Sequence, residues 1–177
     1  MNEYFKKGNE NQSPLEIKKY PDSVLRNISK PVENLDEGVL WLIENMAKSM
    51  YINQGIGLAA PQVGYNRQVI TFDVGKGLVS LINPHIVESE GEKYNQEGCL
   101  SLPEISVEVK RKSKVLVKGL DIKGKETVIE ASDPLSRVIQ HEIDHLNGIL
   151  LIDKTSLLKK QFLINKLKKI KKRSVRQ

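Results

Sequence analysis

The chain has a single cysteine among its 177 residues and lacks any long apolar run. A transmembrane helix needs about 18 or more continuous apolar residues, and the longest apolar stretches here, such as 77–82, are interrupted within a few positions. One thiol cannot form an intramolecular disulfide, and it is typical of a reducing compartment or of a dedicated chemical role. We therefore expect neither a membrane span nor a disulfide framework.

The N-terminal residues lack the features of a targeting segment. Residues 1–7 contain no apolar core, and Glu3, Glu10 and Glu16 make the segment too acidic for an organelle transit peptide. We therefore expect a cytoplasmic protein that acts where it is made. Residues 1–19 are polar and without periodicity, which predicts a flexible arm.

Acidic residues are absent from the C-terminal tail. Residues 154–177 hold ten of the 28 Lys and Arg residues and no acid, so that 1–153 carry 18 basic against 22 acidic residues. The tail therefore carries a charge of +10 and residues 1–153 carry −4, so the net charge of +6 comes from the tail. This distribution indicates a mildly acidic body with a cationic segment, rather than a domain whose whole surface binds nucleic acid.

Apolar spacing predicts three helices. The first follows the start signal at 34–37 and ends near Asn53. The second is expected to begin at Asp133, which would cap its N-terminus, and to end at Asn147. The third begins after Ser156 and carries lysines opposite its apolar side.

Between residues 67 and 130 the pattern changes to short β-rich runs separated by glycine-containing turns. The expected strands are 68–74, 78–83, 105–109, 114–120 and 126–130. Short strands joined by turns favour antiparallel sheets. The predicted fold class is therefore α+β, with antiparallel sheets around the second helix, an N-terminal helix and a basic C-terminal helix.

Two of the three histidines lie in an HExxH sequence, His141 to His145, on the second helix. Residues four apart share one face of a helix, so both imidazoles can reach one metal ion. Glu142 lies close enough to contact a water at that ion without being a ligand itself. Two unrelated histidines are the alternative, which the spacing and the intervening glutamate disfavour.

A catalytic metal site usually has three protein ligands and an open position. Cys99 is the natural third ligand, because a thiolate binds metals strongly and the segment EGCLS at 97–101 places it in a loop before the strand at 105. Without the two histidines, a lone cysteine would be interpreted as a small buried hydrophobic residue.

The segment GIGLAAPQ at 55–62 superficially matches a dinucleotide-binding fingerprint. The context excludes that function, because a helix precedes the segment and Pro61 interrupts the place where the fingerprint requires a second helix. Gly55 and Gly57 can instead let the backbone approach a ligand closely, and Gln62 offers an amide N–H to a developing oxyanion.

Together these three segments resemble the motifs of peptide deformylases: GIGLAAPQ at 55–62, EGCLS at 97–101 and QHEIDH at 140–145. The similarity continues through 21–26, 82–84 and 146–150, and so covers about residues 20–155. The resemblance implies removal of the N-formyl group from the initiator methionine of nascent polypeptides, which gives formate and a free N-terminus.

The resemblance also implies a role for each matching residue. Cys99, His141 and His145 would bind one metal ion per chain, with Fe²⁺ preferred and Ni²⁺, Co²⁺ or Zn²⁺ able to substitute. Geometry alone would favour zinc. Glu142 would act as general base and then as general acid.

The remaining roles fall on backbone groups and one amide. Gln62 and the Leu100 N–H would form the oxyanion hole, and the backbone of Ile56, Gly57 and Gly98 would bind an extended substrate. We thus expect a flexible arm over 1–19, a single catalytic metallohydrolase domain over 20–155 and a basic helix or tail over 156–177.

The basic C-terminal helix has two interpretations. It is a solvated charged helix, or it docks on ribosomal RNA near the exit tunnel, as basic C-terminal helices of deformylases do; phosphate attraction of this kind is salt-dependent. No element for sequence-specific reading of nucleic acid is expected. Two alternative functions stay open at this point: another HExxH metallohydrolase such as an endopeptidase, and a non-enzymatic ribosome- or RNA-binding protein with a structural metal.

Overall fold

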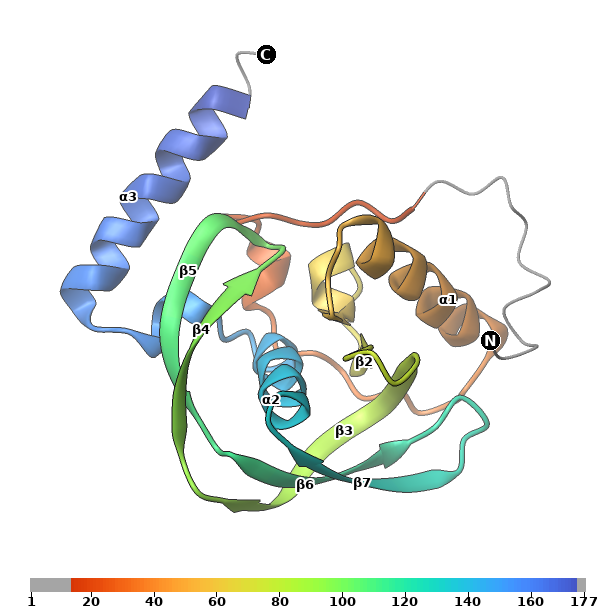
Figure 1. Cartoon of the computed structure of the whole chain (residues 1–177). Coiled ribbons are helices and arrows are strands. Elements are labelled where there is room, and N and C mark those ends of the chain that lie inside the picture. The colour runs from red at the N-terminus through yellow and green to blue at the C-terminus, as the bar shows by residue number, and fades with distance from the viewer. Residues whose placement is uncertain (1–13, 175–177) are drawn as a thin grey trace.

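The helix that carries the HExxH sequence, α2 (Leu135–Leu146), lies in the middle of the molecule with strands on two sides (Figure 1). The structure is a computed structural model that describes residues 14–174. The other helices are α1 (Glu37–Ile52), α3 (Leu157–Ser174) and the short 3₁₀ segments Ser23–Arg26, Ala60–Val63 and Leu151–Lys154.

The strands form two antiparallel sheets. The larger has the order β1-β2-β3-β6-β7, and the smaller is a β4-β5 pair. The strands are β1 (Gly57–Ala59), β2 (Val69–Phe72), β3 (Val79–Glu90), β4 (Lys93–Cys99), β5 (Leu102–Arg111), β6 (Lys114–Leu120) and β7 (Glu126–Ser132). Every neighbouring pair within these sheets is antiparallel. The predicted α+β class with antiparallel sheets around the second helix is thus confirmed.

Most predicted elements appear near their expected positions, but β3 continues seven residues beyond the predicted end at 83 and β5 begins three residues before the predicted start at 105. The start of α2 also differs. The capping residue is Pro134, and no side chain caps the helix. The prediction that Asp133 is the N-cap is wrong, because its carboxylate is directed to Lys93, with Nζ and Oδ2 3.4 Å apart. In α1 the expected start is confirmed, since Asp36 Oδ1 accepts from Val39 N–H at 2.9 Å.

Two strands were not expected from the sequence. One is β1, and the other is β4, whose last residue is Cys99. The prediction that Cys99 lies in a loop is therefore wrong. The segment from Lys93 to Cys99 lacks apolar alternation, and only Glu97 among its side chains is buried. A strand whose one fully buried side chain is a carboxylate carries no hydrophobic signal.

Apolar packing fixes the orientation of α2. Val138, Ile139 and Leu146 are buried in one cluster with Ile70 and Val117 of the larger sheet. A helix that buries one stripe against a sheet presents its other faces elsewhere. The side of α2 that bears the histidines is thus directed to β4 and β5.

The chain before residue 20 differs from the predicted arm over part of its length. Residues 1–13 lie outside the described residues, but Ile17 is buried in the core and Lys18 N–H donates to the Gln62 carbonyl at 2.7 Å. Residues 14–19 therefore lie along the body rather than extending away from it. The division of the chain into arm, catalytic domain and tail stays a prediction.

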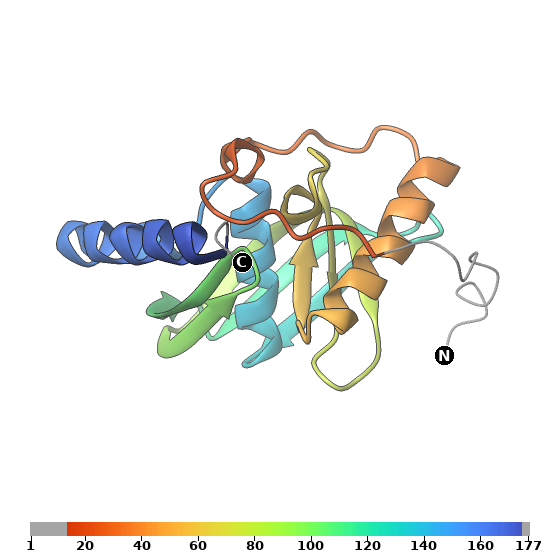
Figure 2. The same ribbon diagram turned by 90° about the horizontal axis from the view of Figure 1, so that it is seen from above.

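The last helix, α3, packs by Leu163 and Leu167, which join a buried cluster with Leu102, Ile105 and Val107 of β5. Beyond this contact it projects from the body, as Figure 2 shows. Within residues 14–174, no helix is both long and apolar enough to span a membrane.

Candidate active site

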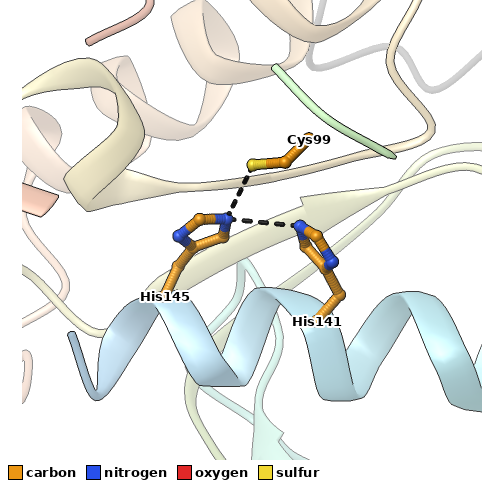
Figure 3. A group of neighbouring side chains, drawn as sticks. All are labelled: Cys99, His141 and His145. Carbon is orange, nitrogen blue, oxygen red and sulfur yellow. Dashed lines mark hydrogen bonds between the residues drawn. The ribbon is translucent and has the colours of Figure 1, made fainter. Parts of the chain in front are cut away.

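Cys99, His141 and His145 converge on one point (Figure 3). His145 Nε2 lies 3.2 Å from Cys99 Sγ and 3.2 Å from His141 Nε2, and the three ligand atoms are all within 4.8 Å of one another. Two imidazole nitrogens and a thiolate suit first-row divalent metals such as iron, zinc, nickel and cobalt. The donor set therefore fits one metal ion and leaves a coordination position open.

Local structure explains this convergence. His141 and His145 are one helical turn apart on α2 and share a face. Cys99 ends β4 at a register shift, since Gly98 is opposite Ser106 whereas Cys99 is opposite Leu102. Figure 3 shows Cys99 approaching from the side opposite α2.

His141 is held by a buried carboxylate. Its Nδ1 lies 3.0 Å from Glu97 Oε2, which fixes Nδ1 as the donor and leaves the Nε2 lone pair directed to the site. Arg111 donates to both Glu97 oxygens at 2.9 Å, and Arg137 donates to Oε1 at 2.7 Å. Burial alone would raise the pKa of Glu97, but hydrogen bonds from His141 and Arg111 outweigh it and lower the pKa to about 2. Glu97 is thus a saturated, ionised acceptor.

The hydrogen-bond network around Glu97 extends through Arg111 to the protein surface. Arg111 also pairs with Asp144, whose other oxygen accepts from Lys154 Nζ at 3.0 Å. Asp144 therefore contacts an arginine and a lysine rather than a ligand imidazole. Arg137 also donates to the carbonyl of Lys93 at 2.8 Å and joins α2 to β4.

His145 is the more deeply buried of the two histidines, with 1% of its surface exposed. Burial, together with the nearby positive charges of Arg111 and Arg26, lowers its pKa well below the usual range. The imidazole is therefore neutral, which is the form that binds metals. The third histidine, His85, is exposed on β3 and lies outside this group.

Glu142 is buried beside the group, and its Oε2 has no hydrogen-bond partner in the part of the chain that the structure describes. Burial raises its pKa to about 7. Gly57 of β1 lies against this carboxylate so closely that a Cβ there would overlap Oε1. An unpartnered carboxylate facing a cavity is available to a reacting water.

Gln62 is held by its amide oxygen. Oε1 accepts from Ala59 N–H at 2.8 Å, which turns Nε2 toward Ser101 Oγ at 3.3 Å and Cys99 Sγ at 3.6 Å. The side chain is 1% exposed. Its N–H group thus points to the candidate metal position from a fixed amide.

A cavity of about 620 Å³ connects these groups to the surface. All the predicted site residues except His145 line it: Ile56, Gly57, Gln62, Gly98, Cys99, Leu100, His141 and Glu142. Further parts of the wall come from residues 102–105 of β5, from Arg137 and Val138 of α2, and from Lys19, 53–55, Gln96 and Glu97. Ile56 is exposed at the rim, and its carbonyl accepts from Asp73 N–H at 3.0 Å.

Three residues of the site, Glu97, Arg111 and Arg137, were not predicted from the sequence. A signal existed for two of them. Glu97 precedes Cys99 by two residues, which places both side chains on the same side of a strand. Arg137 precedes His141 by four residues, on the same face of a helix.

Known proteins are similar to this chain in sequence and in fold. A family model described as polypeptide deformylase matches residues 14–161. A peptide deformylase of Thermodesulfovibrio yellowstonii is 51% identical over 159 residues, which are 87% of this chain and 96% of that protein. One from Thermoanaerobacter pseudethanolicus is 53% identical over 138 residues, 78% of this chain and 87% of that protein.

Solved structures agree in fold. The crystal structure of a peptide deformylase from Legionella pneumophila has a TM-score of 0.89 and 42% identity, and covers 93% of this chain and 99% of that chain. A peptide deformylase from Ehrlichia chaffeensis in complex with actinonin has a TM-score of 0.87 and 37% identity, with 89% of this chain and 98% of that chain covered.

Proposed function

This chain belongs to the peptide deformylase family, and we propose that Cys99, His141 and His145 hold the metal ion on which its activity depends. The family removes the N-formyl group from the initiator methionine of nascent polypeptides and releases formate. The chain is accordingly a metal-dependent hydrolase. The observation that carries the proposal is the convergence of the three ligand atoms beside buried Glu142, whose Oε2 has no hydrogen-bond partner among residues 14–174.

We propose that the bound ion is Fe²⁺, one per chain, with Ni²⁺, Co²⁺ or Zn²⁺ able to replace it. The mixed nitrogen and sulfur donor set supports this group of metals. Such an ion, when bound, acidifies water and polarises a carbonyl.

Glu142 is the proposed proton carrier. Its carboxylate takes a proton from the water that attacks the formyl carbon and returns it to the amine as the C–N bond breaks. Its burial and its position next to His141 support this assignment. The products are formate and a free N-terminus.

Gln62 and the Leu100 N–H are the proposed donors to the tetrahedral oxyanion. The bond from Ala59 to the Gln62 oxygen supports this role, because it keeps the amide from turning its oxygen toward the negative charge. A fixed donor costs no reorganisation when the charge develops.

The substrate backbone is proposed to add to the open edge of β1. This strand pairs with β2 on one side only and ends the larger sheet. An extended peptide can complete such an edge by main-chain hydrogen bonds. Ile56 and Gly57 would provide this edge, and Gly98 would contact the peptide from the opposite cavity wall.

Metal binding tests the ligand assignment. Cys99→Ser and His145→Ala are expected to lose the ion after anaerobic purification, measured as metal per chain by elemental analysis. His85→Ala is the matched control, because His85 is exposed on β3. Full metal content in Cys99→Ser and His145→Ala would refute the assignment.

Product analysis tests the reaction. A formyl-methionyl tripeptide should yield formate and an otherwise intact tripeptide, whereas an endopeptidase would cut a peptide bond. Internal fragments without formate would favour the endopeptidase alternative, and metal binding without any product would favour a structural metal in a binding protein.

We propose that α3 docks on the ribosome and that the enzyme acts in the cytoplasm, where nascent chains emerge. The lysines on α3 support attraction to RNA phosphates. Replacing Lys168, Lys171 and Lys172 by glutamine should reduce co-sedimentation with ribosomes at low salt. The control replaces Lys76, Lys118 and Lys125, which are exposed elsewhere on the body. Equal co-sedimentation of the two triple variants would refute docking through α3.

A further inference from the structure

The wall of the cavity on the β5 side is an irregular segment. Gly98 is opposite Ser106 and Cys99 is opposite Leu102, so residues 103–105 have no counterpart on β4. We call these three residues the β5 bulge. All three line the cavity. The shape of this wall therefore depends on a segment that strand pairing does not fix.

The central residue of the bulge needs outside support. Glu104 has φ of 58°, in the left-handed region that side chains other than glycine rarely adopt. Such a conformation costs energy and persists only where the surroundings hold it. The ladder hydrogen bonds that stabilise the rest of β5 do not hold Glu104, because the bulge is outside the register.

The support comes from the C-terminal helix. Lys166 Nζ of α3 donates to the Glu104 carbonyl at 2.6 Å, across 62 residues of sequence. On either side of this bond, Leu163 and Leu167 are buried in the cluster that contains Leu102 and Ile105. One face of α3 thus packs against Leu102 and Ile105, which flank Pro103 and Glu104, while Lys166 binds the Glu104 carbonyl between them.

We propose that Lys166 is a positioning residue for the substrate: through the Glu104 carbonyl, α3 holds the β5 bulge in the conformation that shapes the pocket. This inference rests on the proposed function, since it takes the cavity as the site of the formylated peptide. The same contact joins the wall of the pocket directly to α3, the helix that carries the basic surface. Deleting α3 would then disturb substrate binding as well as any docking.

The test compares Lys166→Met with Lys159→Met, in the full-length, metal-loaded enzyme acting on a formyl-methionyl tripeptide. Methionine is one atom shorter than lysine, keeps an unbranched apolar side chain and cannot donate a hydrogen bond. Lys159 is an exposed lysine of the same helix and serves as the matched control. Lys166→Arg restores a donor. Each variant is measured for KM, kcat, metal per chain, thermal midpoint and hydrogen exchange of the amides in 102–106.

We expect Lys166→Met to raise KM by about three- to tenfold, the range that the loss of one hydrogen bond gives. Its kcat and metal content should match those of Lys159→Met, and its thermal midpoint should fall by no more than the loss of one exposed hydrogen bond gives. Exchange in 102–106 should be faster, and Lys166→Arg should recover the wild-type KM.

Equal KM values for Lys166→Met and Lys159→Met would overturn the proposal. So would a parallel loss of kcat, metal and thermal stability, because that pattern marks a purely structural contact. Failure of the proposed function is distinct, since the unmodified enzyme would then release no formate at all.

Discussion

Gly57 of β1 leaves the space that the Glu142 carboxylate of α2 occupies, because a Cβ at position 57 would lie 2.4 Å from Glu142 Oε1. A Cβ at position 57 would also lie 2.9 Å from Val138 Cγ1, closer than real side chains approach. The glycine therefore sets the place of the proposed proton carrier.

Gly57→Ala should displace Glu142 and lower kcat by about tenfold or more, because small displacements of a reacting group are costly. Metal content should stay at one ion per chain, since the three ligands lie elsewhere on α2 and on β4. Steady-state kinetics and elemental analysis measure the two quantities. Unchanged kcat would show that the contact does not position Glu142.

Gln62→Leu should reduce kcat by about 100- to 1,000-fold, the usual effect of losing one oxyanion donor. Leucine also removes the oxygen that accepts from Ala59 N–H. Gln62→Glu separates the two effects, because it keeps that acceptor and lacks the N–H. Both variants should be impaired with metal content intact. Normal turnover of Gln62→Glu would exclude the oxyanion role.

Glu97→Gln should weaken metal binding by about 10- to 100-fold, as replacement of a carboxylate behind a metal-binding imidazole typically does. It should also lower stability, because Arg111 and Arg137 would lose their buried counter-charge. Competition with a chelator for Co²⁺ measures the affinity. Glu108→Gln, an exposed carboxylate on β5, is the control. Identical affinities in the two variants would contradict the positioning of His141 by Glu97.

Low pH should weaken the ion pairs that Asp153, in the 3₁₀ segment Leu151–Lys154, forms with Arg26 and with Lys160 of α3. Partial burial would raise its pKa, but hydrogen bonds from Arg26 and Lys160 outweigh it and lower the pKa from 3.8 to about 2. Since the folded-state pKa is the lower one, the ionised carboxylate stabilises the fold above about pH 4, and this is lost as pH falls toward 2.

Asp153→Asn should therefore cost about 1–2 kcal/mol at pH 6, after allowance for the solvent exposure of Arg26. The difference in free energy of unfolding between the wild type and this variant should shrink as pH falls from 4 to about 2. Denaturant titrations at several pH values measure it. A difference that is independent of pH would contradict the predicted ion pairing.

The sequence predicts best those features that depend on residues close together in the chain. The HExxH histidines follow from helical spacing alone, and Cys99 follows from the need for a third ligand. Strand β4 could not be predicted because its one fully buried side chain, Glu97, is charged. Its partners Arg111 and Arg137 come from two other elements, so no single segment shows the network.

Contacts across long separations lie beyond such reasoning. The bond from Lys166 to Glu104 joins residues 62 positions apart. In the sequence, nothing distinguishes Lys166 from the other lysines of the basic helix. Only the packing of α3 on β5 distinguishes it.

The central claim is that Glu142 carries the proton in a metal-dependent deformylation. The most direct measurement is formate release from a formyl-methionyl tripeptide by anaerobically prepared, Fe²⁺-loaded enzyme, with Glu142→Ala alongside at equal metal content. We predict release by the wild type and its loss in the variant. Release at the wild-type rate by Glu142→Ala, or none by the wild type with one ion bound per chain, would contradict the claim.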